Sequence, residues 1–298
     1  MLRSPRAPLA VVLAAWLGCG APRADDCPAT QLSDDRFHSP VPNPPGLGLP
    51  HEARYDTSAP GVVTDGVTGL VWQRALDAGR YTRDEAARAC DGLALAGGPW
   101  RLPTVLELIS LVDDTRANPS IDPVAFPDTP GTYFWTATPR AGMPAMGWNV
   151  YFGLGDAYYY DLTDTNAVRC VAVSPRAHDG CRVSRGGTIT DTDTKLTWQA
   201  VVDETARTWD DAVAYCDALA LDGGGWRLPR LNELRSLVDA GRASPAIDTS
   251  AFPGTPNENF WTASPFARTP GNAWYVYFAD GFAGYNLTTS TYRVRCVR

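Results

Sequence analysis

An internal repeat constrains this 298-residue chain more than any other feature of its sequence. The motif Trp-Arg-Leu-Pro occurs at residues 100–103 and again at residues 226–229, a shift of 126 residues. The same shift relates further landmarks: Trp72 and Trp198, Cys90 and Cys216, Phe-Trp-Thr-Ala at 134–137 and 260–263, Arg-Cys-Val at 169–171 and 295–297. A constant shift excludes a net insertion in one copy between these landmarks. The sequence therefore predicts two domains of one fold in tandem.

The repeat also divides the chain into segments. Each copy has about 110 residues, the usual size of a domain with a single core. We assign a signal segment to residues 1–24, a proline-rich spacer to 25–60, a first domain to 61–175 and a second domain to 176–298. The spacer assignment rests on its prolines, which remove backbone donors and favour extended chain.

Residues 1–24 have the composition of an export signal. Two arginines precede an apolar run at residues 9–17, which is too short to span a bilayer. Two processing routes remain open: Cys19 is lipidated as in a bacterial lipoprotein, or a signal peptidase cleaves within residues 21–24. We expect an outer-membrane or cell-surface lipoprotein in the first case, and a periplasmic or secreted protein in the second.

The cysteines support export. Apart from Cys19 the chain has six, and an even number fits an oxidising compartment. Equivalent domains should pair their cysteines equivalently, and two cysteines without a repeat partner are left to each other. We therefore predict three disulfides: Cys90–Cys170, Cys216–Cys296 and Cys27–Cys181.

Charge and histidine content argue against several classes of function. The net charge is −7, whereas nucleic acids and anionic membranes select basic patches. We expect no nucleic-acid partner, and membrane contact only through a lipid at Cys19. None of the three histidines recurs at the repeat shift, so histidine-dependent triads and zinc sites have no candidate in either domain. We predict no catalytic residue, no bound metal and no cofactor, and hence a protein that is not an enzyme.

Both copies give the same predicted secondary structure. A short strand at residues 70–73 precedes two helices, which begin at capping boxes at residues 82–85 and 104–107. Three later runs are β-prone: 134–137, 148–152 and 168–171. Helices followed by strands predict an α+β fold, in which two helices pack on short, mostly antiparallel strands.

The combined pattern resembles a bacterial family, the C-terminal domain of the Legionella collagen-like protein. The matching residues are 68–73, 86–90, 100–104, 107–108, 134–136 and 169–171, with the equivalent positions of the second copy. This resemblance implies an exported bacterial protein with a surface-binding role, since the best-known member is implicated in adhesion and in binding sulfated polysaccharides.

The order of elements is also similar to the C-type lectin fold, in which a cysteine of the first helix bonds to one in the last strand. The resemblance implies two tandem C-type-lectin-like domains. Lectins of this fold that hold sugar through calcium use Glu-Pro-Asn or Gln-Pro-Asp with Trp-Asn-Asp. Neither Glu-Pro-Asn nor Gln-Pro-Asp occurs in this sequence. The Trp-Asn-Asp motif is also absent, because Val150 follows Trp148 and Asn149. We therefore expect no sugar binding by that calcium mechanism.

Charged residues that recur in both copies have two interpretations. Paired carboxylates could bind calcium or act as acid and base, but helix capping and turn formation explain them more simply. The recurring pairs are Glu107 and Glu233, Asp113 and Asp239, Asp122 and Asp248, Asp65 and Asp191. We expect the recurring arginines to be structural and to pair with these acids: Arg101 and Arg227, Arg169 and Arg295.

Aromatic residues that differ between the copies are the candidates for ligand binding, because surface positions vary more than core positions. Exposed tyrosine offers a flat apolar ring with a polar tip, which suits sugar or protein surfaces. The alternative is that these side chains are half-buried in a sheet. The predicted ligand-binding residues are Tyr158, Tyr159, Tyr160, Tyr275, Phe282 and Tyr285.

The sequence thus predicts an exported bacterial binding or adhesion protein without catalytic activity. Its partner would be a polysaccharide or a surface protein, bound by the late-strand loops, with two similar sites acting together through avidity. Two alternatives remain: a structural envelope protein without a specific ligand, and an enzyme related to the formylglycine-generating enzymes.

Overall fold

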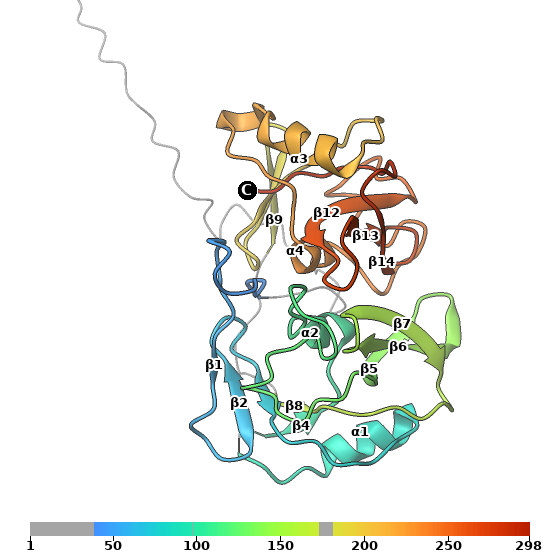
Figure 1. Cartoon of the computed structure of the whole chain (residues 1–298). Helices are drawn as coiled ribbons and strands as arrows, with labels where there is room; N and C mark the ends of the chain where they lie inside the picture. The colour runs from blue at the N-terminus through green and yellow to red at the C-terminus, as the bar shows by residue number, and fades with distance from the viewer. Residues whose placement is uncertain (1–38, 97, 173–180) are drawn as a thin grey trace, which may run out of the picture.

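The computed structural model describes residues 39–96, 98–172 and 181–298, which form two domains with the same order of elements (Figure 1). The predicted signal segment, the lipidation site Cys19 and Cys27 lie outside the described residues.

The first domain contains two antiparallel sheets and two helices. Strands β1 (Tyr55–Asp56), β2 (Val62–Asp65), β3 (Val71–Gln73), β8 (Val171–Ala172) and β4 (Trp100–Arg101) form one sheet in the order β1-β2-β3-β8-β4. Strands β5 (Tyr133–Arg140), β6 (Met143–Tyr151) and β7 (Asp156–Asp161) form the other. The helices are α1 (Arg83–Asp91) and α2 (Val105–Ile109).

The second domain repeats this arrangement. Strands β9 (Arg182–Arg185), β10 (Thr188–Asp191) and β11 (Thr197–Gln199) form one sheet, and β12 (Asn259–Pro265), β13 (Asn272–Tyr277) and β14 (Ala283–Leu287) form the other. The helices are α3 (Trp209–Asp217) and α4 (Leu231–Arg235), with a 3-10 turn at Leu221–Gly223. Val297 bridges Trp198 and Arg227, as β8 bridges β3 and β4. The prediction of two tandem domains with short helices and antiparallel strands is therefore confirmed.

Local sequence explains where the helices begin. Both predicted capping boxes are present: the backbone N–H of Thr82 donates to the Glu85 carboxylate at 2.9 Å, and that of Thr104 to Glu107 at 2.8 Å. Each box satisfies N–H groups that the first helical turn leaves without partners. The predicted strand at residues 168–171 is shorter than expected, since β8 covers only Val171–Ala172.

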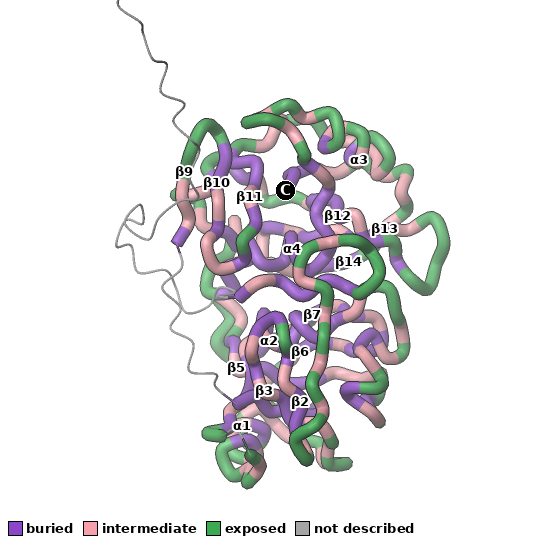
Figure 2. The backbone as a smooth tube through the Cα atoms, turned by 90° about the vertical axis from the view of Figure 1, so that its left-hand side faces the viewer, coloured by how far each residue is buried: buried purple, intermediate pink, exposed green. Residues whose placement is uncertain are grey.

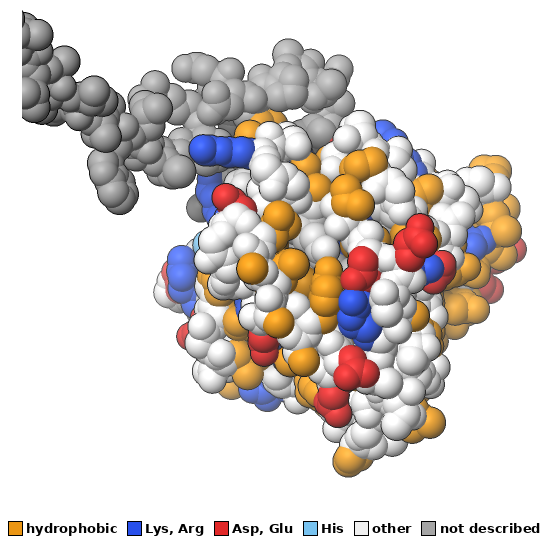
Figure 3. All heavy atoms as spheres, turned by 90° about the horizontal axis from the view of Figure 1, so that it is seen from above, with side chains coloured by type: hydrophobic (Ala, Val, Ile, Leu, Met, Phe, Trp, Pro, Cys, Tyr) orange, Lys and Arg blue, Asp and Glu red, His pale blue; other side chains and the backbone are white. Residues whose placement is uncertain are grey.

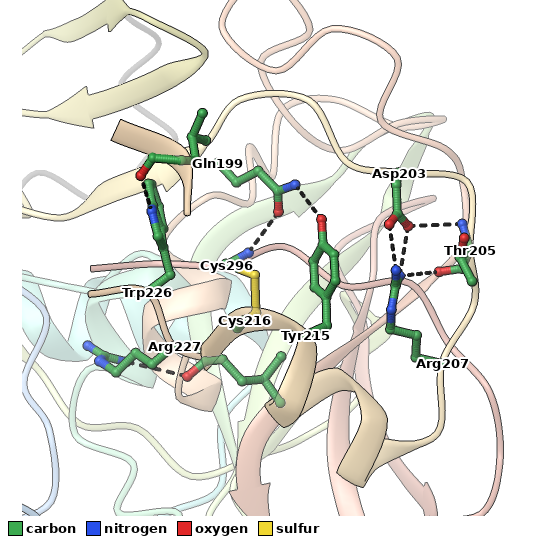
Figure 4. The surroundings of a disulfide bond; sticks show 11 residues. Gln199, Asp203, Thr205, Arg207, Tyr215, Cys216, Trp226, Arg227 and Cys296 are labelled. Atoms are coloured by element: carbon green, nitrogen blue, oxygen red, sulfur yellow. Dashed lines mark hydrogen bonds and ion pairs between the residues drawn. A yellow bond between two sulfur atoms is a disulfide. The ribbon is translucent and has the colours of Figure 1, made fainter. Parts of the chain in front are cut away.

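Two predicted disulfides are confirmed, Cys90–Cys170 and Cys216–Cys296. Each ties the first helix of its domain to the end of that domain. Beside the second bond, the Gln199 side chain donates to the Tyr215 hydroxyl at 3.0 Å and accepts from the backbone N–H of Cys296 at 3.3 Å (Figure 4). Cys181 is also disulfide-bonded, and its predicted partner Cys27 lies outside the described residues.

The β5-β6-β7 sheet and the β12-β13-β14 sheet each separate two packed regions. In the first domain, Trp135 packs with the Cys90–Cys170 disulfide on the α1 side. Phe134 and Trp148 pack on the α2 side. The α2-side cluster does not end at the domain boundary, because it also contains Leu231 and Leu234 of α4 and Phe260 and Trp274 of the second sheet. The two domains therefore share one apolar core, and buried chain is continuous across the junction in Figure 2.

Part of the predicted spacer is built into this junction. Val41 is buried and lines a small void with Leu106 and Ile109 of α2 and Arg235 of α4. The Asn43 side chain donates to the Glu233 carboxylate of the second domain at 3.2 Å. Residues 41–43 thus pack against both domains and do not act only as a linker.

Three polar contacts across the junction have their donors in or beside α4 of the second domain. Asn232 donates to the Val112 carbonyl at 2.8 Å, Arg235 to the Gly155 carbonyl at 2.8 Å, and Arg230 pairs with the buried Asp114. These donors occupy the positions of Thr104, Leu106 and Ile109 in the first copy, and Asp114 corresponds to Ala240. The two copies have therefore diverged where they meet.

We predict that the ion pair across the junction can be replaced by the residues of the opposite copy. Arg230→Thr alone leaves Asp114 buried without its cation and should lower the free energy of unfolding by about 3–5 kcal/mol. Arg230→Thr with Asp114→Ala removes both charges and should recover about 2 kcal/mol or more of that loss. Urea unfolding of the wild type, both single variants and the double variant measures this coupling. Additive losses in the double variant would show that the pair does not act as a unit.

Candidate ligand-binding surface

Four tyrosines share one face of the β5-β6-β7 sheet. Tyr133 pairs with Tyr151, Asn149 with Tyr158, and Gly147 with Tyr160 across the strands. Directly paired residues project from the same face of an antiparallel sheet. We call Tyr133, Tyr151, Tyr158 and Tyr160 the tyrosine face.

The rings of the tyrosine face contact one another. Tyr133 stacks on Tyr151 with ring centroids 4.5 Å apart and meets the edge of Tyr160 at 4.8 Å. Tyr158 lies 5.7 Å from Tyr160 and is 41% exposed, while the other three are partly buried. Burial and the neighbouring Tyr160 raise the pKa of the Tyr133 phenol. The Tyr133 phenol is therefore neutral at pH 7.

Sequence reasoning found half of this face. Tyr158 and Tyr160 were among the predicted residues, whereas Tyr133 and Tyr151 were not. Tyr133 corresponds to Asn259 in the second copy, so the criterion that aromatic positions differ between the copies could also have identified Tyr133. Tyr151 recurs as Tyr277, and only the strand pairing reveals its place.

The predicted residue Tyr159 projects from the opposite face. Its ring meets the edge of Trp148 at a centroid distance of 5.7 Å, and the Arg140 guanidinium lies 3.7 Å above it. Arg140 in turn pairs with Asp280 of the second domain at 3.3 Å. Tyr159 is therefore part of the packing between the domains.

The predicted residues of the second domain have separate surroundings. Tyr275 packs edge-on against Tyr292 at 5.0 Å and is half-buried. Tyr285 on β14 is 43% exposed and stacks on Phe266 at 3.7 Å. Phe282 precedes β14 and meets Tyr158 of the first domain at 6.1 Å. Five of the six predicted residues lie within strands rather than in late-strand loops.

The equivalent face of the second copy keeps Tyr277 at the position of Tyr151 but lacks the other three tyrosines. The positions of Tyr133, Tyr158 and Tyr160 hold Asn259, Gly284 and Asn286. An added Cβ at Gly284 would lie 2.6 Å from the Tyr275 hydroxyl, so a side chain there would require Tyr275 to move. The cluster of four tyrosines is therefore particular to the first domain.

Asp156 lies at the start of β7, beside the junction. Its Oδ1 is buried and has no hydrogen-bond partner among the described residues. Burial raises the pKa of the Asp156 carboxyl to about 6, and the charge of Arg235 only partly opposes this. Arg235 is itself fully buried, which lowers its pKa to about 10.

The recurring carboxylates have structural partners. Asp65 accepts from the backbone N–H groups of Val67 and Thr68, and Asp122 from those of Val124 and Ala125. Asp113 and Asp239 accept from turn residues and pair with an arginine three residues later. Across residues 39–96, 98–172 and 181–298, no group of three or more His, Cys, Asp and Glu is placed to hold a metal ion.

The recurring arginines divide into two kinds. Arg101 pairs with Glu107 at 2.6 Å and Arg227 with Glu233 at 2.7 Å, so the expected pairing with acids is confirmed for these two. For Arg169 and Arg295 it is wrong. Both are fully buried. Arg169 donates to the carbonyls of Gln73 and Arg74 and to the Thr129 hydroxyl. Arg295 donates to the carbonyls of Gln199 and Ala200 and to the Thr255 hydroxyl. Burial lowers the pKa of each of these arginines to about 9.

The surface offers little for an anionic or deeply buried ligand. A pocket between residues 42–45 and the end of α2 has a volume of about 30 Å³, which suits about one water molecule rather than a sugar ring. On the described part of the α3 end, positive and negative side chains are interspersed rather than gathered into a basic patch (Figure 3). The tyrosine face is therefore the better candidate site.

Comparison with known families agrees with the repeat. A model of the Lcl C-terminal domain matches residues 61–172 and again residues 187–298. The chain belongs to the Lcl C-terminal domain family. Each match includes one of the confirmed disulfides. No curated protein matches the chain. In the described part of the molecule, no helix is long and apolar enough to cross a membrane.

We predict that Asp156 destabilises the protein at neutral pH. Its pKa is about 6 in the folded state, above the value of about 3.9 for an unperturbed aspartate. The folded state therefore binds this proton more tightly, and the free energy of unfolding should fall as the pH rises from about 4 to about 6. Asp156→Asn should be more stable than the wild type by about 1–3 kcal/mol at pH 7 and equally stable at pH 4.

Urea unfolding of both proteins across this pH range measures the effect. Asp65 also has a pKa raised by burial. It contributes equally to both proteins, so the difference between them isolates Asp156. A stability difference that does not change with pH would contradict the assignment.

Proposed function

We propose that this protein is an exported, non-catalytic binding protein of the bacterial surface, with a polysaccharide as its ligand. The exposed ring of Tyr158 on the tyrosine face carries this proposal. Exposed tyrosine binds well because its flat ring buries apolar area while the hydroxyl keeps a polar contact. The C–H faces of sugar rings are complementary to such a surface.

The disulfides support export. Bonds of this kind persist in oxidising compartments and are rare in reducing ones. The chain carries Cys90–Cys170 and Cys216–Cys296, and Cys181 is bonded as well. The protein then reaches the periplasm, the cell surface or the medium, and a lipid at Cys19 is one route by which it stays attached.

We further propose a C-type-lectin-like fold for each domain. The support is a shared covalent arrangement: a cysteine of the first helix bonds to a cysteine just before the segment that closes the domain, β8 in the first copy and the bridging Val297 in the second. A sheet of three antiparallel strands lies between the two helices in sequence and this closing segment. Sugar binding in this protein does not depend on calcium, since the recurring carboxylates are engaged in turns, caps and ion pairs.

A glycan array tests the proposal. The mature chain should bind a subset of polysaccharides, equally with calcium and with a chelator. Tyr158→Ala should weaken that binding by about tenfold, as expected for the loss of a central aromatic contact. Val124→Ala is the matched control, because it truncates a side chain that is 77% exposed outside the β5-β6-β7 sheet.

Binding that Tyr158→Ala leaves unchanged would exclude the tyrosine face. Absence of binding to every glycan would exclude the polysaccharide, and pull-down with envelope proteins would then test a protein partner.

A further inference from the structure

The exposed end of the tyrosine face meets the second domain. Strands β7 and β14 are the edge strands of their sheets and lie against each other across the junction. The Phe282 ring approaches Tyr158 edge-to-face, with centroids 6.1 Å apart and planes at 83°. An aromatic ring of the second domain therefore borders the most exposed tyrosine of the first.

A second contact fixes the same corner. Tyr158 stacks on its neighbour Tyr159 at 4.8 Å with the planes 9° apart. Tyr159 lies under Arg140, which pairs with Asp280. The Asp280 carboxylate also accepts the backbone N–H of Phe282 at 3.0 Å, so one turn of the second domain holds both ends of this aromatic row.

The aromatic contact between Tyr158 and Phe282 is not repeated with the roles of the two domains exchanged. By the repeat shift, Tyr158 corresponds to Gly284 and Phe282 corresponds to Asp156. The pair that would mirror the aromatic contact thus consists of a glycine and an aspartate. The junction provides one aromatic corner, although the chain contains two copies of the domain.

We propose that the two domains form a single composite binding site at this corner, in which Phe282 completes the surface begun by Tyr158, and that its ligand is an uncharged polysaccharide. This inference rests on the function proposed above. It replaces two similar sites acting by avidity with one site per chain. The second domain contributes a wall of the site and fixes its shape.

Charge around the corner decides the class of ligand. The Arg140 guanidinium lies over Tyr159 in the row of rings, and Asp280 already neutralises it. Asp161 is exposed at the end of β7. Sulfated and carboxylated polymers are bound through unpaired Arg and Lys, and acids beside the site repel them. The corner therefore favours uncharged sugar chains.

The test uses the full mature chain on an array of uncharged mannans, glucans and galactans beside heparin and dextran sulfate. Phe282→Ala, a change in the second domain, should weaken binding of uncharged glycans by about tenfold, as Tyr158→Ala does. Tyr285→Ala is the matched control, because Tyr285 on strand β14 is as exposed as Tyr158, but its ring stacks on Phe266. It should bind like the wild type. Titration calorimetry with the best soluble glycan should give one site per chain.

Each outcome has a distinct meaning. If the wild type binds no glycan, the proposed function fails, and the composite site with it. If the wild type binds, any of four results overturns the composite site while the binding function stands. Two concern the variants: Phe282→Ala leaves binding unchanged, or Tyr285→Ala weakens it as much as Phe282→Ala does. Two concern the wild type: calorimetry gives two sites per chain, or dextran sulfate binds best. Phe282→Leu keeps the apolar volume and removes the ring. It therefore separates loss of the contact from loss of folding, which thermal unfolding monitors in every variant.

Discussion

Burial of α2 and α4 in one apolar cluster at the junction is the interaction on which the rest of the structure depends. Each of these helices has five residues, and helices this short are unstable in water without tertiary packing. Their apolar side chains belong to one cluster that extends through both domains. The two copies therefore share one core and are not two independently packed domains. Residues 41–43 are packed into the same region.

The shared core also explains where the copies differ. In a symmetric junction every contact would occur twice, and the mirror of Arg230 with Asp114 would be Thr104 with Ala240. In this chain the second copy has the donors Arg230, Asn232 and Arg235, and the first offers Asp114 and two backbone carbonyls. Divergence at these positions satisfies polar groups that would otherwise be buried without partners, which is costly. The same junction brings Phe282 to Tyr158 and thereby links the architecture to the proposed site.

Much of the fold could be predicted because its determinants are local or repeated. Capping boxes at Thr82 and Thr104 mark helix starts through contacts three residues apart. The disulfide pairs follow from equal spacing in two copies. The extent of the last strand was harder, because tertiary packing decides how far a strand continues. Arg169 illustrates another limit: its burial against carbonyls could not be distinguished in sequence from a salt bridge.

The sequence by itself determined that the chain has two copies of one α+β domain, which cysteines pair within each copy, and which aromatic positions differ between them. These properties depend on short-range contacts or on comparison of the copies. Only the tertiary structure decided which aromatic side chains lie together. Strand register places Tyr133 and Tyr151 on the same face as Tyr158, and packing of the domains brings Phe282 of the other copy to Tyr158. Neither can be obtained from sequence spacing, because both depend on how separate sheets bury their apolar faces against a common core.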